Sequence, residues 1–168
     1  MSEVLETKLR PDWTEMERVN EVAHEFLERC GLSDDLVDTF TMVACELVEN
    51  GIKYGDAQPG PAGSLELHVS VAETSITVQV RNRITPGSRH HLRQLDQTLQ
   101  WIRGFQDPFQ AYIERLKQIA REPTSQRRSG LGIVRIAYEA RAAIDFVMSE
   151  ADSLSVSAVA KVADQEGL

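Results

Sequence analysis

Apolar and polar side chains alternate along several short stretches of the chain, which is the pattern of β-strands with one buried face. Residues 3–10 (EVLETKLR) alternate in this way and predict a short strand at the edge of a sheet. Residues 65–71 and 76–80 alternate around a turn at Glu73 and Thr74, and residues 143–148 and 154–162 do so around the turn SEADS. These four stretches predict two β-hairpins.

Other segments repeat apolar residues at helical spacing. Asp12 begins an N-terminal capping pattern (DWTE) for a helix that runs to about Arg29, and Ser33 restarts a second helix that runs to about Tyr54. Residues 88–105 and 107–121 predict two amphipathic helices, the second opened by the pair Asp107-Pro108. GLGIVRIAYEA predicts a further helix. The order of elements favours an α+β two-layer sandwich, with helices on one face of a mostly antiparallel sheet.

The composition narrows the possible functions. With 168 residues, the chain is expected to form one domain, residues 1–168. The net charge of −8 argues against nucleic-acid binding, which depends on clustered lysine and arginine. The apolar runs are too short for a membrane span, and the N-terminus is acidic where a signal peptide is apolar, so a cytoplasmic protein is expected. Two cysteines without CxxC spacing indicate neither a disulfide framework nor a zinc site.

Two clusters of residues are candidates for a site. In the helix over residues 35–54, Glu46, Asn50 and Lys53 form a stripe along one flank of the apolar face, and Tyr54 falls within that face. The stripe is equally compatible with the ordinary polar border of an amphipathic helix. The second cluster is the Gly130, Leu131, Gly132 sequence at the start of a helix, where free backbone N–H groups favour an anion such as phosphate. Those glycines could also serve tight helix packing.

Taken together, ELVENGIKYG and GLGIVRI resemble the motifs of the GHKL (Bergerat-fold) ATPases, and among them the anti-sigma-factor serine kinases of the RsbW and SpoIIAB type. The resemblance covers nearly the whole chain apart from residues 84–125. It implies ATP and Mg²⁺ as cofactors, Glu46 as the general base and Asn50 as the magnesium ligand. It also implies that Lys53 contacts phosphate and that Tyr54 packs beside the nucleotide. Arg128, next to the glycine turn, could reach a phosphate.

The chain departs from that family's pattern at two places. The family carries Asp-x-Gly-x-Gly at the end of the second hairpin strand, whereas this sequence reads VQVRNRITPG, with Asn82 near the aspartate position. An asparagine can still accept a hydrogen bond from an adenine amino group, at a loss of roughly 1 kcal/mol of charge assistance. In addition, a helical insert at about residues 88–122 replaces the usual nucleotide lid. Both departures are similar to the SiaB-type kinases, which phosphorylate a small regulatory protein. The insert could equally extend the core or form a dimer contact.

Two functions remain open at this point. The first is a regulatory protein serine/threonine kinase that uses Mg-ATP to phosphorylate a small antagonist protein in a partner-switching pathway. The retained Glu46 favours it, since a domain that only binds nucleotide needs no base there. The second is a non-catalytic, anti-sigma-like binding module with a degenerate pocket, which the missing glycines after Asn82 favour. The family resemblance also implies a homodimer, and a sigma factor is one candidate partner.

Overall fold

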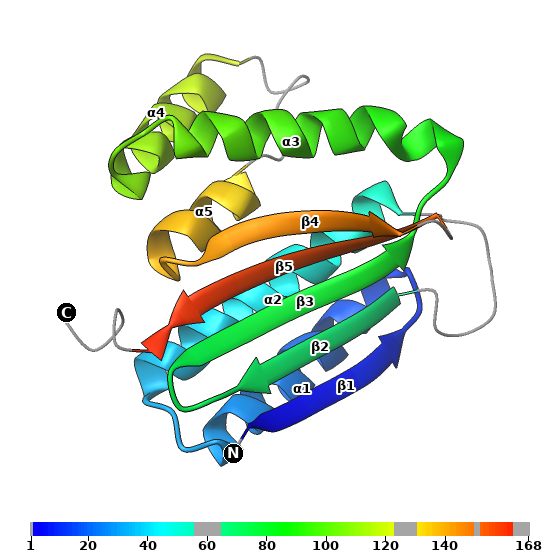
Figure 1. Cartoon of the computed structure of the whole chain (residues 1–168), viewed down its shortest axis with the longest axis vertical. Coiled ribbons are helices and arrows are strands. Elements are labelled where there is room, and N and C mark those ends of the chain that lie inside the picture. The colour runs from blue at the N-terminus through cyan, green and yellow to red at the C-terminus, as the bar shows by residue number, and fades with distance from the viewer. Residues whose placement is uncertain (1, 56–64, 123–130, 150–151, 163–168) are drawn as a thin grey trace.

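A computed structural model describes residues 2–55, 65–122, 131–149 and 152–162 of the chain (Figure 1). The described strands form one antiparallel sheet in the order β1-β2-β3-β5-β4, so that β5 lies between β3 and β4. The strands are β1 (Glu3–Leu9), β2 (Leu65–Val71), β3 (Ser75–Arg83), β4 (Ala143–Ser149) and β5 (Ser153–Lys161). The predicted edge strand and both predicted hairpins are confirmed.

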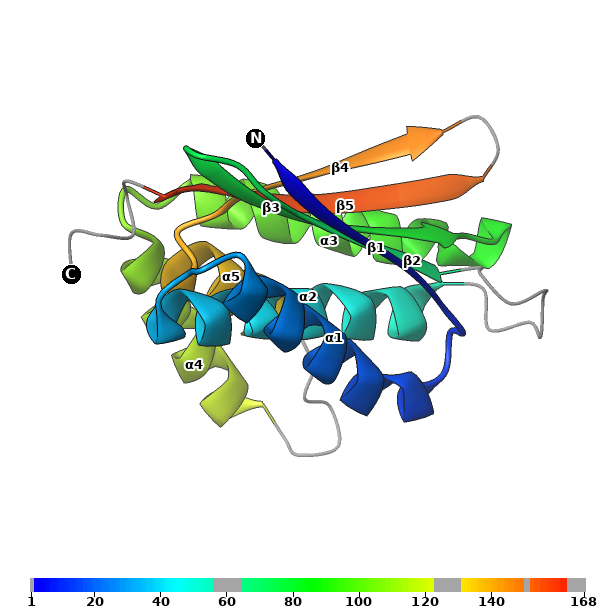
Figure 2. The same cartoon turned by 90° about the horizontal axis from the view of Figure 1, so that it is seen from below.

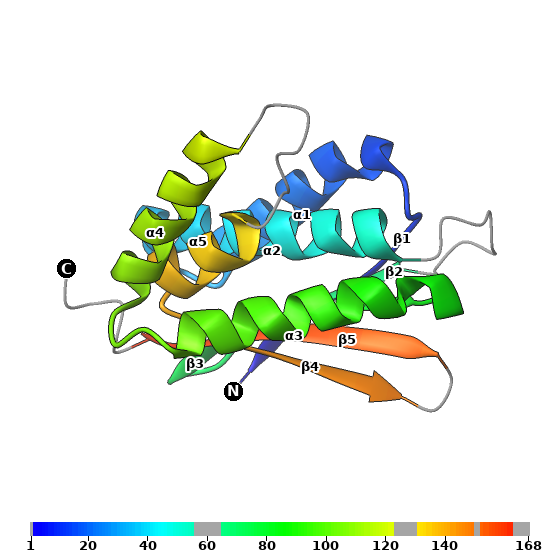
Figure 3. The same cartoon turned by 90° about the horizontal axis from the view of Figure 1, so that it is seen from above.

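The helices gather on one side of the sheet and leave its other face open (Figure 2). The layer that covers the sheet consists of α1 (Met16–Arg29), α2 (Asp34–Tyr54) and α5 (Leu131–Glu139). Between the two hairpins lie α3 (Arg89–Arg103), which runs along the β4 side of the sheet, and α4 (Pro108–Arg121), which packs against α5 (Figure 3). The predicted α+β two-layer sandwich is therefore confirmed. Within the described residues, no helix is both long and apolar enough to cross a membrane.

Local sequence signals begin and end these helices. The Asp12 carboxylate accepts a hydrogen bond from the Thr14 N–H at 2.9 Å, and a short 3-10 turn at Trp13–Glu15 leads into α1. Gly31, at a φ of +75°, takes the left-handed conformation that ends this helix. The Asp107 carboxylate accepts from the Phe109 N–H at 2.9 Å, with Pro108 as the first residue of α4.

Close packing of α2 against the sheet positions the candidate site. The buried face of α2 includes Phe40, Val43, Ala44 and Leu47. At Gly51, an added Cβ would lie 2.6 Å from Cδ1 of Leu65 on β2, closer than real side chains approach. Glycine therefore lets the C-terminal half of α2 approach β2 and β3, and it brings the end of the helix next to the end of β3.

Candidate functional site

A cavity of about 1300 Å³ lies between the helix layer and the sheet. Its walls come from the C-terminal half of α2, the strands β3 and β5, the helical pair α3 and α4, and Ile133 of α5. The volume is large enough for a nucleotide-sized ligand. Of the predicted residues that the structure describes, three line it: Asn50, Tyr54 and Asn82.

Asn50 and Tyr54 stand one turn apart on the cavity side of α2. The Asn50 side chain is half-buried and forms no hydrogen bond with any described residue, so its amide is available to a ligand. The ring of Tyr54 packs against the ring of His91 on α3, with the centroids 4.5 Å apart. An aromatic wall therefore stands beside a free amide, an arrangement suited to a planar base attached to a polar chain.

Asn82 lies at the end of β3 and points toward the helices because Val78, Val80 and Asn82 share the inward face of the strand. Its side chain is 5% exposed, and Nδ2 donates a hydrogen bond to the carbonyl oxygen of Arg83 at 3.3 Å. The donor of the amide is thus engaged with the backbone, and Oδ1 has no partner among the described residues. Asn82 lines the cavity, at the position where the family resemblance predicts an aspartate.

Glu46 lies one turn before Asn50 on α2 and contacts the first turn of α5. Its Oε1 accepts a hydrogen bond from Arg135 Nη1 at 3.2 Å, and a Cβ added at Gly132 would collide with its carboxylate. Burial raises the pKa of Glu46, and the neighbouring Glu49 adds to this effect, whereas Arg135 and Lys53 act in the opposite direction. A carboxyl with a raised pKa, held in place by a cation, is suited to accept a proton.

Arg135 is a site residue that the sequence reasoning missed. Its guanidinium bonds both Glu46 and Glu139, the latter through Nε at 3.1 Å and Nη2 at 3.4 Å. One signal could have found it: Arg135 follows Gly132 by three residues in GLGIVRI, so both residues lie on the same face of α5. A cation on the face that meets Glu46 is a natural partner for that carboxylate.

The remaining predicted residues are placed differently. Lys53 pairs with Glu49 at 2.7 Å and lies 5.8 Å above the ring of Trp13, and it does not line the cavity. Leu131 begins α5 and is half-buried. Gly130 and Arg128 lie outside the described residues. The predicted contacts of Lys53, Arg128 and the glycine turn with phosphate stay predictions.

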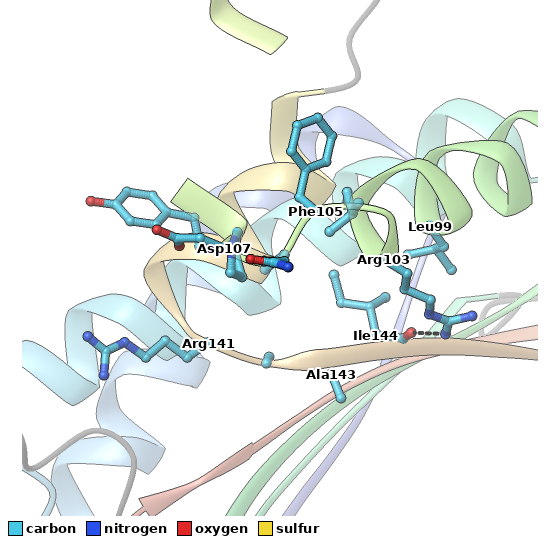
Figure 4. A pocket seen from close by; sticks show the side chains of 13 residues that line it. Leu99, Arg103, Phe105, Asp107, Arg141, Ala143 and Ile144 are labelled. Atoms are coloured by element: carbon cyan, nitrogen blue, oxygen red, sulfur yellow. Dashed lines mark hydrogen bonds between the residues drawn. The ribbon is translucent and has the colours of Figure 1, made fainter. Parts of the chain in front are cut away.

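A second cavity, of about 570 Å³, lies where α3 turns into α4 beside the start of β4 (Figure 4). Two of the charged residues that line it have structural roles. Arg103 Nη2 donates to the carbonyl oxygen of Ile144 at 3.0 Å, and Asp107 caps α4. None of the predicted residues that the structure describes lines it. The larger cavity is therefore the candidate site.

An antiparallel sheet covered on one face by helices, with the E-x-x-x-N helix beside a cavity that reaches the sheet, defines an ATPase domain of the Bergerat type. The chain belongs to the histidine kinase-like ATPase family, whose domain model matches residues 9–143. The resemblance predicted from ELVENGIKYG and GLGIVRI is thereby confirmed.

A solved structure with a similar fold is that described as the crystal structure of the SiaB-SiaC complex from Pseudomonas aeruginosa. The matched chain superposes with a TM-score of 0.69 at 17% sequence identity, over 93% of this chain and 88% of the other. At this identity the likeness concerns the fold. A comparison with curated proteins gives no match.

Proposed function

We propose that this protein is an ATP-dependent protein serine/threonine kinase that phosphorylates a small regulatory partner. The observation that carries the proposal is the spatial relation of three groups. The free amide of Asn50 lies in the cavity, the carboxylate of Glu46 lies one helical turn away, and the N-terminal turn of α5 closes against that carboxylate. Phosphoryl transfer needs such placement of a base, a metal ligand and a phosphate cradle more than it needs covalent chemistry.

Each residue has a role in this proposal. The cavity takes the nucleotide, with its base between Tyr54 and Asn82. Glu46 accepts the proton of the attacking hydroxyl, and Arg135 holds the carboxylate in position. Asn50 supplies an amide oxygen to Mg²⁺, which when bound would neutralise charge on the phosphates. Mg²⁺ usually keeps several waters and binds through few protein ligands together with substrate phosphates, so the remaining ligands would be phosphate oxygens and water.

The matched structure is a complex of SiaB with SiaC. By analogy, we propose that the substrate is a small regulatory protein in a partner-switching pathway, with a sigma factor as one further candidate partner. We also propose a cytoplasmic location and a homodimer, in keeping with the family resemblance.

A second function, a partner-binding module without catalysis, is favoured by one observation. Asn82 stands where the related ATPases carry an aspartate, and a neutral acceptor binds an amino group more weakly than a carboxylate does. The two functions predict different behaviour toward ATP, so the experiment that separates them is a binding measurement.

Calorimetric titration with ATP, with and without Mg²⁺, tests the proposal on the wild-type protein and on Asn50→Ala. Binding that depends on Mg²⁺ and is lost in Asn50→Ala is the expected result. Absence of binding up to millimolar ATP would leave the partner-binding module. Glu46→Gln is expected to keep ATP binding but to stop phosphoryl transfer to the partner. Transfer at the wild-type rate would exclude Glu46 as the base.

A further inference from the structure

The helical pair between the hairpins forms the second wall of the large cavity. His91, Leu95 and Thr98 of α3 and Arg115 of α4 line it, facing the side that carries Asn50 and Asn82. A ligand that fills the cavity would touch residues of α3 and α4, which lie outside the motifs of the family resemblance. The polar and charged side chains of α3 and α4 in the cavity would therefore contribute to how such a ligand is bound.

The charges along the cavity are few. Among the described residues that line it, Arg115 is the one lysine or arginine and Glu122 the one carboxylate. A nucleoside triphosphate carries several negative charges, and their transfer into a cavity requires compensating groups. Lys53, for which the family resemblance implies a phosphate contact, is paired with Glu49 and does not line the cavity.

Arg115 also differs from the other half-buried lysine and arginine residues in its ion pairing. Three lysine or arginine residues are half-buried in the described part of the chain: Lys53, Arg115 and Arg135. Lys53 is paired with Glu49, and Arg135 with Glu46 and Glu139. Arg115 forms no ion pair with a described residue, and its Nη1 donates at 3.0 Å to the neutral Oε1 of Gln118. A guanidinium has five N–H donors, so most of its capacity for an anion is unused.

The half of α4 that carries Arg115 is the half that reaches the cavity. Phe109 and Tyr112, in the first half of α4, both pack against Tyr138 near the C-terminal end of α5, at centroid distances of 5.1 and 5.2 Å. The second half of α4 contributes Arg115 and Gln118 to the cavity, and Ile133, next to Gly132 in the first turn of α5, lines the same cavity. Tyr54 and His91, which are in ring contact, belong to the end of α2 and the start of α3, and a Cβ added at Gly55, next to Tyr54, would lie 2.8 Å from Nδ2 of Asn82.

We propose that Arg115 binds the phosphate groups of the nucleotide, so that the helical insert supplies the cation that Lys53 does not bring into the cavity. This inference rests on the proposed function and deepens it. A bidentate guanidinium contact to phosphate is stronger and more directional than an ammonium contact, and it forms here without breaking an existing ion pair.

The test compares adenosine, ADP and ATP, each with Mg²⁺, by calorimetric titration of the wild type, Arg115→Gln and the control Arg93→Gln. Arg93 is an exposed arginine on α3 that does not line the cavity. For Arg115→Gln we expect the affinity for ATP to fall about 10- to 100-fold, as for the loss of a charged hydrogen bond. The affinity of this variant for ADP should fall less than that for ATP, and its affinity for adenosine should not change. Arg93→Gln should match the wild type for all three ligands.

Several outcomes would overturn the role of Arg115. An equal loss for adenosine and ATP would indicate a structural effect on the cavity, and an unchanged affinity for ATP would exclude the contact. Lys53→Gln provides a direct comparison, because a larger loss there than in Arg115→Gln would return the role to Lys53. If the wild type binds ATP and Arg115→Gln does so equally well, only this inference fails. If the wild type binds none of the three ligands, the proposed function fails with it.

Discussion

Arg135 on α5 donates a hydrogen bond from Nη1 to Oε1 of Glu46 on α2 at 3.2 Å, and the same guanidinium binds Glu139 on its own helix. The Glu46 side chain is 21% exposed and that of Arg135 is 34% exposed, so the pair is only partly screened by water. The cation opposes the effect of burial on the pKa of Glu46. It therefore helps to keep the carboxylate ionised and fixes its orientation.

Replacing Arg135 by glutamine removes this opposing effect. We expect the pKa of Glu46 to rise, so that the acidic limb of the pH–rate profile for phosphoryl transfer moves to higher pH, while the affinity for ATP changes little. Lys117→Gln is the matched control, because Lys117 pairs with Glu114 at 2.8 Å away from the cavity. A profile that coincides with that of the control would show that Arg135 does not act on the base.

Glu46→Gln is expected to stabilise the folded protein at neutral pH. Because burial raises the pKa of Glu46, the folded state holds this proton more tightly than the unfolded state, and stability falls as pH rises through that range. The gain in melting temperature should shrink as pH is lowered and the wild-type carboxyl becomes protonated.

Glu114→Gln should instead destabilise the folded protein at neutral pH. Its hydrogen bond with Lys117 lowers the pKa of Glu114, so the ionised carboxylate is favoured by folding, and that contribution is lost as pH falls. Melting curves of both variants over a range of pH check the two signs. A destabilised Glu46→Gln at neutral pH would mean that the bond to Arg135 outweighs the cost of burial.

Gly132→Ala tests the contact between α5 and the base. An added Cβ would collide with the Glu46 carboxylate, which sits at the end of a flexible side chain and can move aside. We therefore expect a stability change within about 1 kcal/mol but a loss of transfer rate of up to about 100-fold, as for a catalytic group displaced by about an ångström. Gly87→Ala is the control, since a Cβ there meets only Thr85 Oγ1, at an ordinary 3.6 Å.

The rate and melting temperature of Gly132→Ala would be measured beside those of the double variant Gly132→Ala/Glu46→Ala. If the displacement of the carboxylate is the cause, the second substitution lowers the rate no further than Glu46→Ala alone does. Additive losses would contradict the proposed contact.

Asn82→Ala tests the acceptor at the end of β3. Removing Oδ1 should weaken ATP binding by about tenfold, the equivalent of one hydrogen bond of roughly 1.4 kcal/mol. The affinity for GTP, which carries a carbonyl in place of the adenine amino group, should not fall in parallel. Equal losses for both nucleotides would indicate that Asn82 supports the pocket without contacting the base.

Much of the fold was predictable because apolar side chains repeat with different periods in strands and in helices. The alternation in residues 65–71 and 76–80, and the capping residues Asp12 and Asp107, were sufficient to predict the strands and helix starts that the structure shows. The E-x-x-x-N spacing likewise placed Glu46 and Asn50 one turn apart on α2.

The partners of the site residues were less predictable, because they come from elements distant in sequence. Arg135 lies 89 residues after Glu46, and only the packing of α5 on α2 brings them together. Lys53 shares a flank with Asn50 on a helical wheel, yet Glu49 lies one turn before it and binds its ammonium group. Periodicity gives the face of a helix, but it does not show which neighbour a long flexible side chain meets.

The place of β5 in the sheet has a consequence for how the chain folds during synthesis. Residues 153–161 pair with β3 on one side and β4 on the other, so the centre of the sheet is completed by nearly the last described residues of the chain. Until the ribosome releases them, β3 presents an open edge of unpaired N–H and C=O groups, a template for association with other chains. A fragment that ends where the family match ends, at residue 143, is therefore expected to aggregate, because it lacks both strands of the second hairpin.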